Sequence, residues 1–264
     1  MSKTNNRIGI PKLNNPVISV ILPTYNEREN INDLISEIGY YISKYTREPI
    51  EFILVDDDSP DKTWEVVQEC FKEDQRVKVI RRTEERGLAS AIRRGIQESR
   101  GDIIVWLDCD FSMPPYKIPE LINKIHQGYD ICVGSKFIKG GKDVRGPVDA
   151  WTAVVLSGIM SNFIRYMLGF TFKDYTSGFV AAKREVFNEI RFGGDYGEYF
   201  IEFIYKARKK EYKIIEIPYY CIPRRFGVSK TGTNLREYFK KGWKYVCLTI
   251  RLKFNLEETD KNRK

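Results

Sequence analysis

Acidic residues stand in three groups along the first half of the chain, and each group follows a short apolar run. The groups are Glu27, the run from Asp56 to Asp58, and the pair Asp108 and Asp110. Carboxylates this close together repel one another, so the arrangement costs stability unless a cation or hydrogen-bond donors neutralise it. Oxygen ligands suit Mg²⁺ or Mn²⁺, and Mg²⁺ in particular is usually held by one or two carboxylates together with waters and phosphates. These residues therefore predict a divalent-cation site that also receives a phosphorylated ligand.

Each acidic group also has a structural interpretation, because Asp is a common helix N-cap and turn residue. For Asp58 and Asp61 we favour this structural interpretation. For Asp108 and Asp110 we favour ligand binding, because they follow the most apolar run and precede Pro114 and Pro115. An Asp-x-Asp motif is weak evidence by itself, and its position in this series gives it weight.

The apolar runs have the length of buried strands, and they alternate with stretches of helical periodicity. We expect strands at 17–22, 50–55, 77–80, 103–107 and 130–133, and helices after the N-cap Asn30 and at 62–71, 88–99 and 118–126. Such alternation predicts an α/β fold, with a Rossmann-like and mostly parallel sheet flanked by helices. Ligands of these sheets bind beyond the carboxyl ends of the strands, which is where the acidic groups fall.

The second half of the chain predicts a less regular arrangement. Glycines and lysines between residues 134 and 149 predict a flexible loop. We then expect an apolar helix between residues 150 and 172, a turn at 174–178, a strand near 179–182, a helix at 199–209, a strand at 213–217 and a basic loop at 224–230. The predicted organisation is a flexible tail (1–15), one α/β domain (16–232), a basic amphipathic helix (233–254) and a disordered tail (255–264).

Charge is unevenly distributed along the chain. There are 44 Lys and Arg against 36 Asp and Glu, and residues 201–264 hold 17 of the former and 7 of the latter. An anionic partner is therefore expected near the C-terminal quarter. The basic, aromatic-rich helix 233–254 fits a helix that lies on an anionic membrane, and it fits equally well a surface helix packed on the core.

Composition limits the compartment and the kinds of site. Five widely spaced cysteines without a CxxC motif, and a single histidine (His126), argue against a zinc site or a disulfide framework. The N-terminus lacks the apolar core of a signal peptide, and no uncharged run reaches the roughly 20 residues of a spanning helix. We expect a cytoplasmic protein, peripheral at the cytosolic face of a membrane.

In order along the chain, these motifs resemble those of family 2 glycosyltransferases, enzymes of the GT-A fold. The matching segments are Pro23-Thr-Tyr-Asn-Glu27, Val55-Asp-Asp-Asp-Ser-Pro-Asp61, Arg86-Gly-Leu88, Asp108-Cys-Asp110 and Gly134-Ser135. Two later segments are similar to the subgroup of dolichyl-phosphate mannose synthases and other polyprenyl-phosphate hexosyltransferases: Thr176-Ser-Gly-Phe179 and Arg224-x-x-Gly-x-Ser-Lys230. The resemblance spans residues 17–230 and identifies segment 16–232 as the expected GT-A domain.

The resemblance implies an inverting transfer of a hexose from a nucleotide sugar to a dolichyl or other polyprenyl phosphate, with Mg²⁺ or Mn²⁺ as cofactor. Mannose from GDP-mannose is the favoured donor. The implied nucleotide-sugar site comprises Pro23, Tyr25, Glu27, Val55, Asp57, Asp108, Cys109, Asp110, Lys136, Arg224 and Lys230. Within it the implied catalytic residues are Asp110, Arg224 and Lys230, and the implied metal ligands are Asp108, Asp110 and Ser112. An anionic membrane surface is a further expected partner, an anchoring membrane subunit is compatible with the resemblance, and no nucleic acid is expected.

Three positions depart from the family pattern, because Lys136, Ala153 and Val180 stand where relatives often carry arginine. Lysine keeps the charge but loses the bidentate fork of arginine. The donor half of the pattern is thus better kept than the acceptor half.

Two other functions stay open at this point. A saccharide hydroxyl as acceptor requires a general base, for which Asp195, Glu198 and Glu202 are the candidates. In a non-enzymatic RNA- or membrane-binding protein, the basic helix matters and the carboxylates do not.

Overall fold

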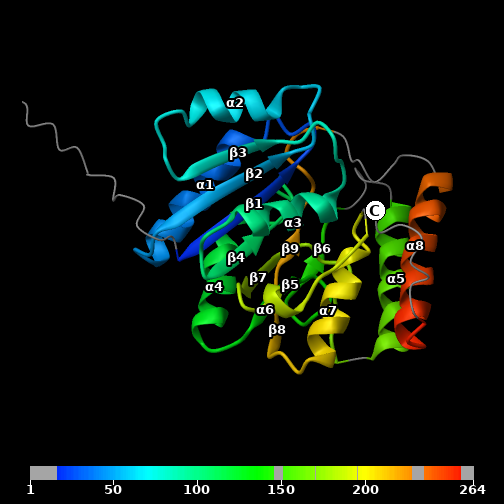
Figure 1. Ribbon diagram of the computed structural model, residues 1–264. Helices are drawn as coiled ribbons and strands as arrows, with labels where there is room; N and C mark the ends of the chain where they lie inside the picture. The colour runs from blue at the N-terminus through cyan, green and yellow to red at the C-terminus, as the bar shows by residue number, and fades with distance from the viewer. Residues whose placement is uncertain (1–16, 146–150, 170, 195, 228–234, 257–264) are drawn as a thin grey trace, which may run out of the picture.

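The computed structural model describes residues 17–145, 151–169, 171–194, 196–227 and 235–256. Within these ranges the chain forms one seven-stranded sheet, one small two-stranded sheet and helices on both faces of the larger sheet (Figure 1). The predicted N-terminal tail, residues 257–264 of the predicted C-terminal tail and the end of the predicted basic loop, including Lys230, lie outside the described residues.

The larger sheet is mostly parallel, as the alternation of elements predicted. Its strand order is β3-β2-β1-β4-β7-β5-β8, and only β7 runs antiparallel to its neighbours. The strands are β1 (Ile18–Thr24), β2 (Ile50–Asp56), β3 (Val77–Arg81), β4 (Ile103–Trp106), β5 (Ile131–Ser135), β7 (Val180–Lys183) and β8 (Ile214–Pro218). Because β1, β2 and β4 are adjacent and parallel, their carboxyl ends meet at one edge.

Helices cover the two faces because alternate strand residues point to opposite sides. On β1, Val20 and Leu22 pack with α1 (Ile31–Tyr45) and α4 (Ile118–His126), whereas Ile21 packs on the other face with α3 (Leu88–Glu98) and α7 (Tyr199–Lys209). The remaining short helices are α2 (Thr63–Cys70), η1 (Pro115–Lys117) and α6 (Val186–Glu189). Trp106 belongs to the core, and its Nε1 donates to the Tyr199 hydroxyl over 3.0 Å.

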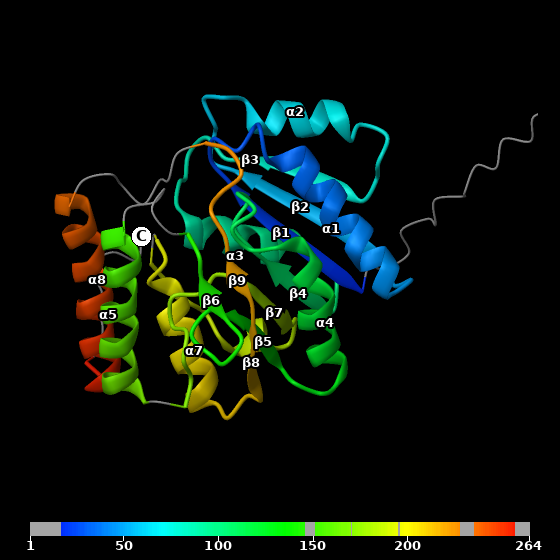
Figure 2. The same ribbon diagram turned by 180° about the vertical axis from the view of Figure 1, so that it is seen from behind.

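Two long helices form an outer pair on the α7 side of the molecule. These helices, α5 (Trp151–Leu168) and α8 (Leu235–Lys253), lie side by side in the views from both sides (Figures 1 and 2). Tyr245, Leu248 and Leu252 of α8 pack against the core cluster that α7 covers. Neither helix, nor any other in the described part of the chain, is long and apolar enough to cross a membrane.

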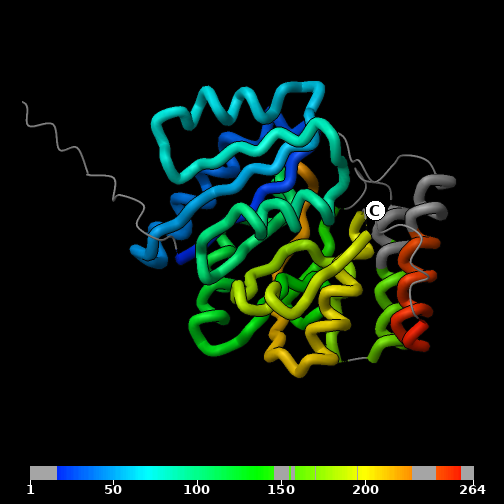
Figure 3. The backbone as a smooth tube through the Cα atoms, in the orientation of Figure 1, coloured from blue at the N-terminus to red at the C-terminus, as the bar shows by residue number. Residues whose placement is uncertain are grey.

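Two local predictions were wrong. Helix α1 does begin after Asn30, but the Asn30 side chain makes no capping bond and instead donates to the Glu27 carboxylate over 2.8 Å. The predicted flexible loop at 134–149 is partly regular, because Gly134 and Ser135 complete β5 and because β6 (Lys142–Asp143) pairs with β9 (Tyr220–Cys221). Figure 3 traces the same backbone as a tube, from blue near the N-terminus to red at the C-terminal end of α8.

Candidate functional site

The carboxyl ends of β1, β2 and β4 bring together carboxylates from three separate sequence motifs. We call Glu27, Asp57, Asp108 and Asp110 the acidic rim. The registers Pro23–Val55 and Ile21–Trp106 place the residues that follow these strands along the same edge of the sheet. Glu27 is 6% exposed and Asp57 is 8% exposed, so two charged groups of the rim are largely removed from water.

The carboxyl of Asp108 is strongly perturbed by its surroundings. Burial, followed by the negative charges of Asp110 and Glu27, raises its pKa to about 6, against the opposing influence of Arg145 and Lys136. The Thr-Ser-Gly turn approaches it closely, since a Cβ on Gly178 would lie 3.8 Å from Asp108 Oδ1. Such a carboxyl, kept among like charges at a sheet edge, is typical of a ligand-binding site.

Asp110 is stabilised in its charged form. Its Oδ1 accepts the Ser112 backbone N–H over 2.9 Å, and its Oδ2 lies 2.7 Å from Arg224 Nη2. Burial alone would raise the pKa of Asp110, but the hydrogen bonds from Ser112 and the Arg224 guanidinium hold this pKa below its ordinary value. Ser112, the predicted third ligand, is 6% exposed beside it.

The segment from Ile222 to Gly227 is held beside the acidic rim by hydrogen bonds to the Asp110 turn. Its backbone bonds to the Asp110 turn through Ile222 N–H to Ser112 O (3.2 Å) and Arg225 N–H to Asp110 O (3.0 Å). The Arg225 guanidinium lies 3.5 Å from the centre of the Phe111 ring. Arg224 Nη2 is also 3.8 Å from Glu27 Oε1, so this arginine contacts two motifs of the rim. The structure thus brings together Arg224 and Asp110, which are far apart in the sequence.

The other residues predicted to contact the nucleotide occupy contrasting environments. The Asp57 carboxylate is bound on both oxygens, by Arg82 Nε (2.8 Å) and by the Gly87 backbone N–H (2.8 Å). Val55 and Cys109 have side chains in the core, with 0% and 3% exposure. Pro23 and Tyr25 are half-buried, and Arg86 lies 5.9 Å from the centre of the Tyr25 ring.

Asp58 and Asp61 were predicted to be helix-capping or turn residues. This prediction is correct for Asp61, whereas Asp58 forms ion pairs. Asp61 Oδ1 accepts the backbone N–H of Thr63 at the start of α2, over 2.9 Å. Asp58 makes no such bond and instead pairs with Arg81 over 2.6 Å and with Arg86 over 3.8 Å.

Lys136 follows β5 and is 7% exposed. Its backbone N–H donates to Asp174 Oδ2 over 3.0 Å, and its Nζ lies 3.6 Å from the same oxygen and 3.4 Å from Thr176 Oγ1. The Asp174 turn is itself held by Glu216 of β8, which accepts the backbone N–H groups of Lys173 and Asp174. A network of buried polar groups therefore fixes the position of Lys136.

The candidate general bases divide into one outside the described residues, Asp195, and two that are described. The Glu202 carboxylate accepts the Gly193 backbone N–H over 2.7 Å and pairs with Lys206 over 2.6 Å. Glu198 is 6% exposed. Val180, at one position where the family often has arginine, is fully buried within β7.

Sequence reasoning missed Arg145, Asp174 and Glu216 as part of this region. Asp174 was assigned only to a turn, although it opens the segment that carries the Thr-Ser-Gly motif. Glu216 lies in an apolar strand, where an acidic residue could have indicated a buried polar contact. Arg145 stood in the predicted flexible loop, where nothing in the sequence indicated its partner Asp143.

The donor set at Asp108, Asp110 and Ser112 fits a divalent cation that is shared with a phosphorylated ligand. Within the described ranges, no group of three or more His, Cys, Asp or Glu side chains is arranged to hold a metal ion by itself. Two neighbouring carboxylates with a hydroxyl suit Mg²⁺ or Mn²⁺, which complete their coordination with water and phosphate oxygens. The negative charge that raises the pKa of Asp108 is the structural observation that favours a cation here.

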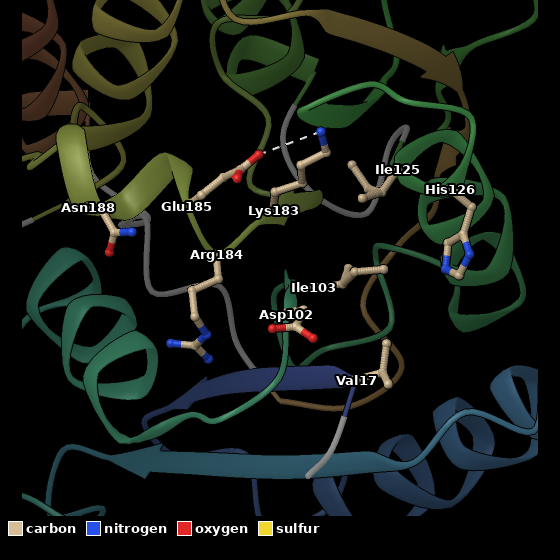
Figure 4. Close-up of a pocket in the computed structure, with 9 residues that line it drawn as sticks. All are labelled: Val17, Asp102, Ile103, Ile125, His126, Lys183, Arg184, Glu185 and Asn188. Atoms are coloured by element: carbon tan, nitrogen blue, oxygen red, sulfur yellow. Dashed lines mark ion pairs between the residues drawn. The ribbon is translucent and has the colours of Figure 1, made fainter.

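A separate depression of about 570 Å³ opens at the amino ends of the parallel strands (Figure 4). Its charged side chains are engaged with one another and with the backbone: Arg184 Nε donates to Gly101 O over 2.6 Å, and Lys183 lies 3.6 Å from Glu185. None of the predicted site residues lines it. Because ligands of such sheets bind at the carboxyl ends, we place the functional site at the acidic rim.

Comparisons with known proteins agree with this geometry. The family model described as Glycosyl transferase family 2 matches residues 19–191. Dolichol-phosphate mannosyltransferase of Pyrococcus furiosus is 40% identical over 225 residues, which make up 84% of this chain but only 62% of that protein. The chain therefore spans less than two thirds of the length of that relative. Polyprenol monophosphomannose synthase of Mycolicibacterium smegmatis is 32% identical over 83% of this chain and 82% of that protein.

Solved structures confirm the predicted GT-A fold. The structure of glucosyl-3-phosphoglycerate synthase from Mycobacterium tuberculosis with Mn²⁺, UDP and glucosyl-3-phosphoglycerate matches with a TM-score of 0.66, covering 94% of this chain and 83% of that one. The two sequences are 20% identical, so this similarity concerns the fold. A structure of the same synthase with Mg²⁺ and UDP matches equally well, with a TM-score of 0.66.

Proposed function

This chain belongs to glycosyl transferase family 2, and from that premise we propose that it transfers a hexose from a nucleotide sugar to a polyprenyl phosphate. Mannose from GDP-mannose is the proposed donor, and Mg²⁺ or Mn²⁺ the proposed cofactor. The relatives that are 40% and 32% identical carry names that describe mannose transfer to dolichol phosphate and polyprenol phosphate, which supports the choice of both sugar and acceptor.

One observation supports the proposal: Asp108 and Asp110 lie together at the sheet edge, and the cationic side chain of Arg224 pairs with Asp110 over 2.7 Å. A nucleoside diphosphate brings negative charge that must be neutralised in the transition state. Arg224, 2.7 Å from Asp110, stands at the border of this site, where its guanidinium could pair with a phosphate oxygen of the donor.

In the proposed reaction, an oxygen of the acceptor phosphate attacks the anomeric carbon of the hexose. The bond between that carbon and the β-phosphate oxygen breaks, and the nucleoside diphosphate leaves with the electron pair. Attack from the face opposite the diphosphate inverts the anomeric centre. Because the acceptor phosphate is already ionised at neutral pH, no proton has to be removed in this step.

Individual residues have distinct proposed roles in this reaction. Asp110, Asp108 and Ser112 hold the cation, which withdraws charge from the leaving diphosphate when bound. Tyr25, Glu27 and Asp57 border the nucleotide pocket together with the backbone of the residues after β1 and β2. Lys136, Arg224 and Lys230 bind phosphate groups, although Lys230 lies outside the described residues.

The hydrogen bond and ion pair that hold the Glu202 carboxylate favour a phosphate acceptor over a saccharide hydroxyl. A general base needs a carboxylate that is able to reach the nucleophile, and the Glu202 carboxylate is held by Gly193 and Lys206. Amidation of Glu202 is therefore expected to leave transfer to a prenyl phosphate intact.

The outer helices support a peripheral position at an anionic membrane, where a polyprenyl phosphate is anchored. Near the end of α8 the exposed side chains include aromatic and cationic groups: Trp243, Lys244, Arg251, Lys253 and Phe254. Ile159 and Tyr166 of α5 are also exposed, at 61% and 73%. Such a mixture is typical of helices that lie in the interface of an anionic bilayer.

Incubation with a panel of radiolabelled GDP- and UDP-sugars, a prenyl phosphate and Mn²⁺ tests this proposal. We expect label from GDP-mannose to move into the organic phase, and to stay in the aqueous phase with the Asp110→Asn variant. If no donor in the panel labels the lipid, while labelled saccharide acceptors accumulate, the acceptor assignment is wrong.

A further inference from the structure

Arg145 lies at the border of the site because two short strands fold the chain back toward β5. A Cβ on Gly141 would come within 2.4 Å of Ser135 O, so only glycine allows this segment to approach the end of β5 so closely. β6 then pairs with β9 through Lys142 N–H to Tyr219 O (3.1 Å), and Val144 N–H donates to Cys221 O (2.8 Å). The segment that leads to Arg145 therefore starts at the end of β5, the same edge of the sheet that carries Lys136.

The same strand pair connects this segment to the Asp110 turn. β9 ends at Cys221, and the next residue, Ile222, donates its N–H to Ser112 O. Tyr219 N–H donates to Ser135 O over 3.2 Å. The backbone path from Arg145 through β9 thus reaches both the turn that carries Asp110 and the strand end that carries Lys136.

The Arg145 guanidinium is held in a fixed orientation by Asp143. Nε donates to Asp143 Oδ1 over 3.0 Å and Nη2 to Oδ2 over 2.6 Å, which is the bidentate geometry of a strong pair. The Asp143 side chain is 8% exposed and the Arg145 side chain is 33% exposed. The aspartate is therefore buried, whereas the arginine is still accessible to solvent. Nη1 of Arg145 makes no hydrogen bond to the part of the chain that the structure describes.

Arg145 and Lys136 act on the same acidic groups. Burial raises the pKa of the Cys221 thiol in β9, and the positive charges of Arg145 and Lys136 both lower it. Lys136 also acts on Asp143, the partner of Arg145. Arg224, in contrast, pairs with Asp110 and Glu27. The site therefore has two separate cationic groups: Arg224 beside Asp110 and Glu27, and the pair Lys136 and Arg145 around Asp143.

We propose that Arg145, oriented by Asp143 beside Lys136, binds the phosphate group of the acceptor, a phosphate monoester. This inference rests on the proposed function, which requires two anionic groups, the donor diphosphate and the acceptor phosphate, to meet in one site. Two anions repel each other, and separate cations reduce that repulsion. The Arg145 guanidinium is fixed in orientation and keeps unused N–H donors. Such a group suits a phosphate, whose oxygens can accept two N–H hydrogen bonds from one guanidinium.

Direct binding measurements separate this inference from the proposed function. Isothermal titration of the full chain with citronellyl phosphate, with inorganic phosphate and with citronellol is compared for wild type, Arg145→Ala and Arg145→Lys. We expect Arg145→Ala to weaken binding of both phosphates by about 10- to 100-fold, the range for loss of a charge-assisted bond. Arg145→Lys retains the charge and should lose less. Citronellol, which lacks the phosphate, should bind equally to all three.

Lys142→Ala is the matched control, since it removes an exposed positive charge from β6, the strand that precedes Arg145. Its affinity for citronellyl phosphate should equal that of wild type, and the affinity of Arg145→Ala for GDP with Mn²⁺ should also be unchanged. Thermal unfolding of every variant checks that the fold is retained, and Arg145→Lys serves if Arg145→Ala does not fold.

Several results overturn the inference. It is wrong if Arg145→Ala binds citronellyl phosphate as tightly as wild type, if GDP affinity falls by the same factor, or if wild type binds neither phosphate. If wild type shows Arg145-dependent phosphate binding but transfers no hexose from any donor, the proposed function fails and the phosphate site stands. If transfer occurs without dependence on Arg145, only this inference fails.

Discussion

Two borders of the candidate site carry opposite charges and come from different parts of the fold. The acidic rim follows three adjacent parallel strands, whereas the basic border, which we define as Lys136, Arg145 and Arg224, comes from the end of β5, the segment after β6 and the segment after β9. The rim is therefore positioned by the sheet itself. The basic border depends on a two-stranded pairing and on loop contacts to the Asp110 turn.

This difference indicates how the two borders respond to change. Rim residues are part of the core layer, so their substitution affects both binding and stability. Residues of the basic border are held in place by a few hydrogen bonds, so their substitution should weaken binding with little loss of folding stability. Substitutions at the acidic rim and at the basic border distinguish these two responses.

Asp110→Asn should cause the largest loss of function. Removing this charge from the cation site is expected to lower kcat for hexose transfer by about 100- to 1,000-fold, the cost of one preorganised electrostatic contact. Asp102→Asn, an exposed aspartate at the opposite end of the sheet, is the matched control and should retain full activity. Equal rates for the two variants under saturating substrates would remove Asp110 from the site.

Asp57→Asn should cause the largest loss of stability. The Arg82 side chain is 6% exposed and would lose its buried counter-charge, keeping only the exposed Glu85 at 3.3 Å. We expect the free energy of unfolding in urea to fall by about 3 kcal/mol, the cost of breaking a buried pair. Glu84→Gln, an exposed acidic residue in the same loop, should leave it unchanged. A similar stability for both variants would mean that the pair contributes nothing.

Asp108→Asn should stabilise the metal-free protein at neutral pH. The pKa of Asp108 is about 6 in the folded state against an ordinary value of 3.8, so between these values the folded protein holds a proton that the unfolded chain has lost. Wild-type stability therefore falls as pH rises through this window, by about 2 kcal/mol. The variant lacks this carboxyl and should not show that loss.

Urea unfolding at pH 4 and pH 8 in the presence of chelator measures this effect. The advantage of Asp108→Asn over wild type should be small at the lower pH and larger at the higher pH. An advantage that is independent of pH would show that burial does not strain this carboxylate.

Arg224→Ala and Arg225→Ala compare neighbouring cations of one segment. Arg224 contacts Asp110 and Glu27, whereas Arg225 is more exposed and contacts Phe111 and Glu37. We expect Arg224→Ala to lower kcat by about tenfold, near the value of one hydrogen bond to a charged group, and Arg225→Ala to lower it less. Steady-state rates with GDP-mannose and a prenyl phosphate measure both. The reverse order would assign the functional cation to position 225.

Trp243→Ser should have the smallest effect. The side chain is 67% exposed on α8, so thermal stability should not change. Binding to vesicles of anionic phospholipid, measured by co-sedimentation, should weaken by roughly threefold to tenfold, because partial burial of an aromatic side chain contributes on the order of 1 kcal/mol. Tyr40→Ser, an equally exposed aromatic residue on α1, is the control. Equal losses for both variants would exclude α8 as the membrane face.

The sequence predicted the acidic rim well for a physical reason. Strand and helix periodicities are local signals, and adjacent parallel strands place the residues after them at one edge without further information. The positions of Glu27, Asp108 and Asp110 follow from that rule alone. Helix α7 was likewise predicted with its observed ends, Tyr199 and Lys209.

The basic border was harder to predict because its contacts join segments distant in sequence. Arg145 acquires its position from β6 and β9, a pair of two-residue strands with no periodic signal. The Asn30 side chain was assigned to a cap because the local sequence favours one, but the nearby Glu27 carboxylate accepts its amide instead. Tertiary contacts decided both cases.

Isothermal titration of the full chain with GDP-mannose, first with Mn²⁺ and then with excess chelator, measures whether the acidic rim binds the diphosphate through a cation. We predict tight binding with Mn²⁺, and loss of binding both in chelator and in the Asp110→Asn variant. Undiminished binding in chelator, or equal binding by Asp110→Asn, would contradict it.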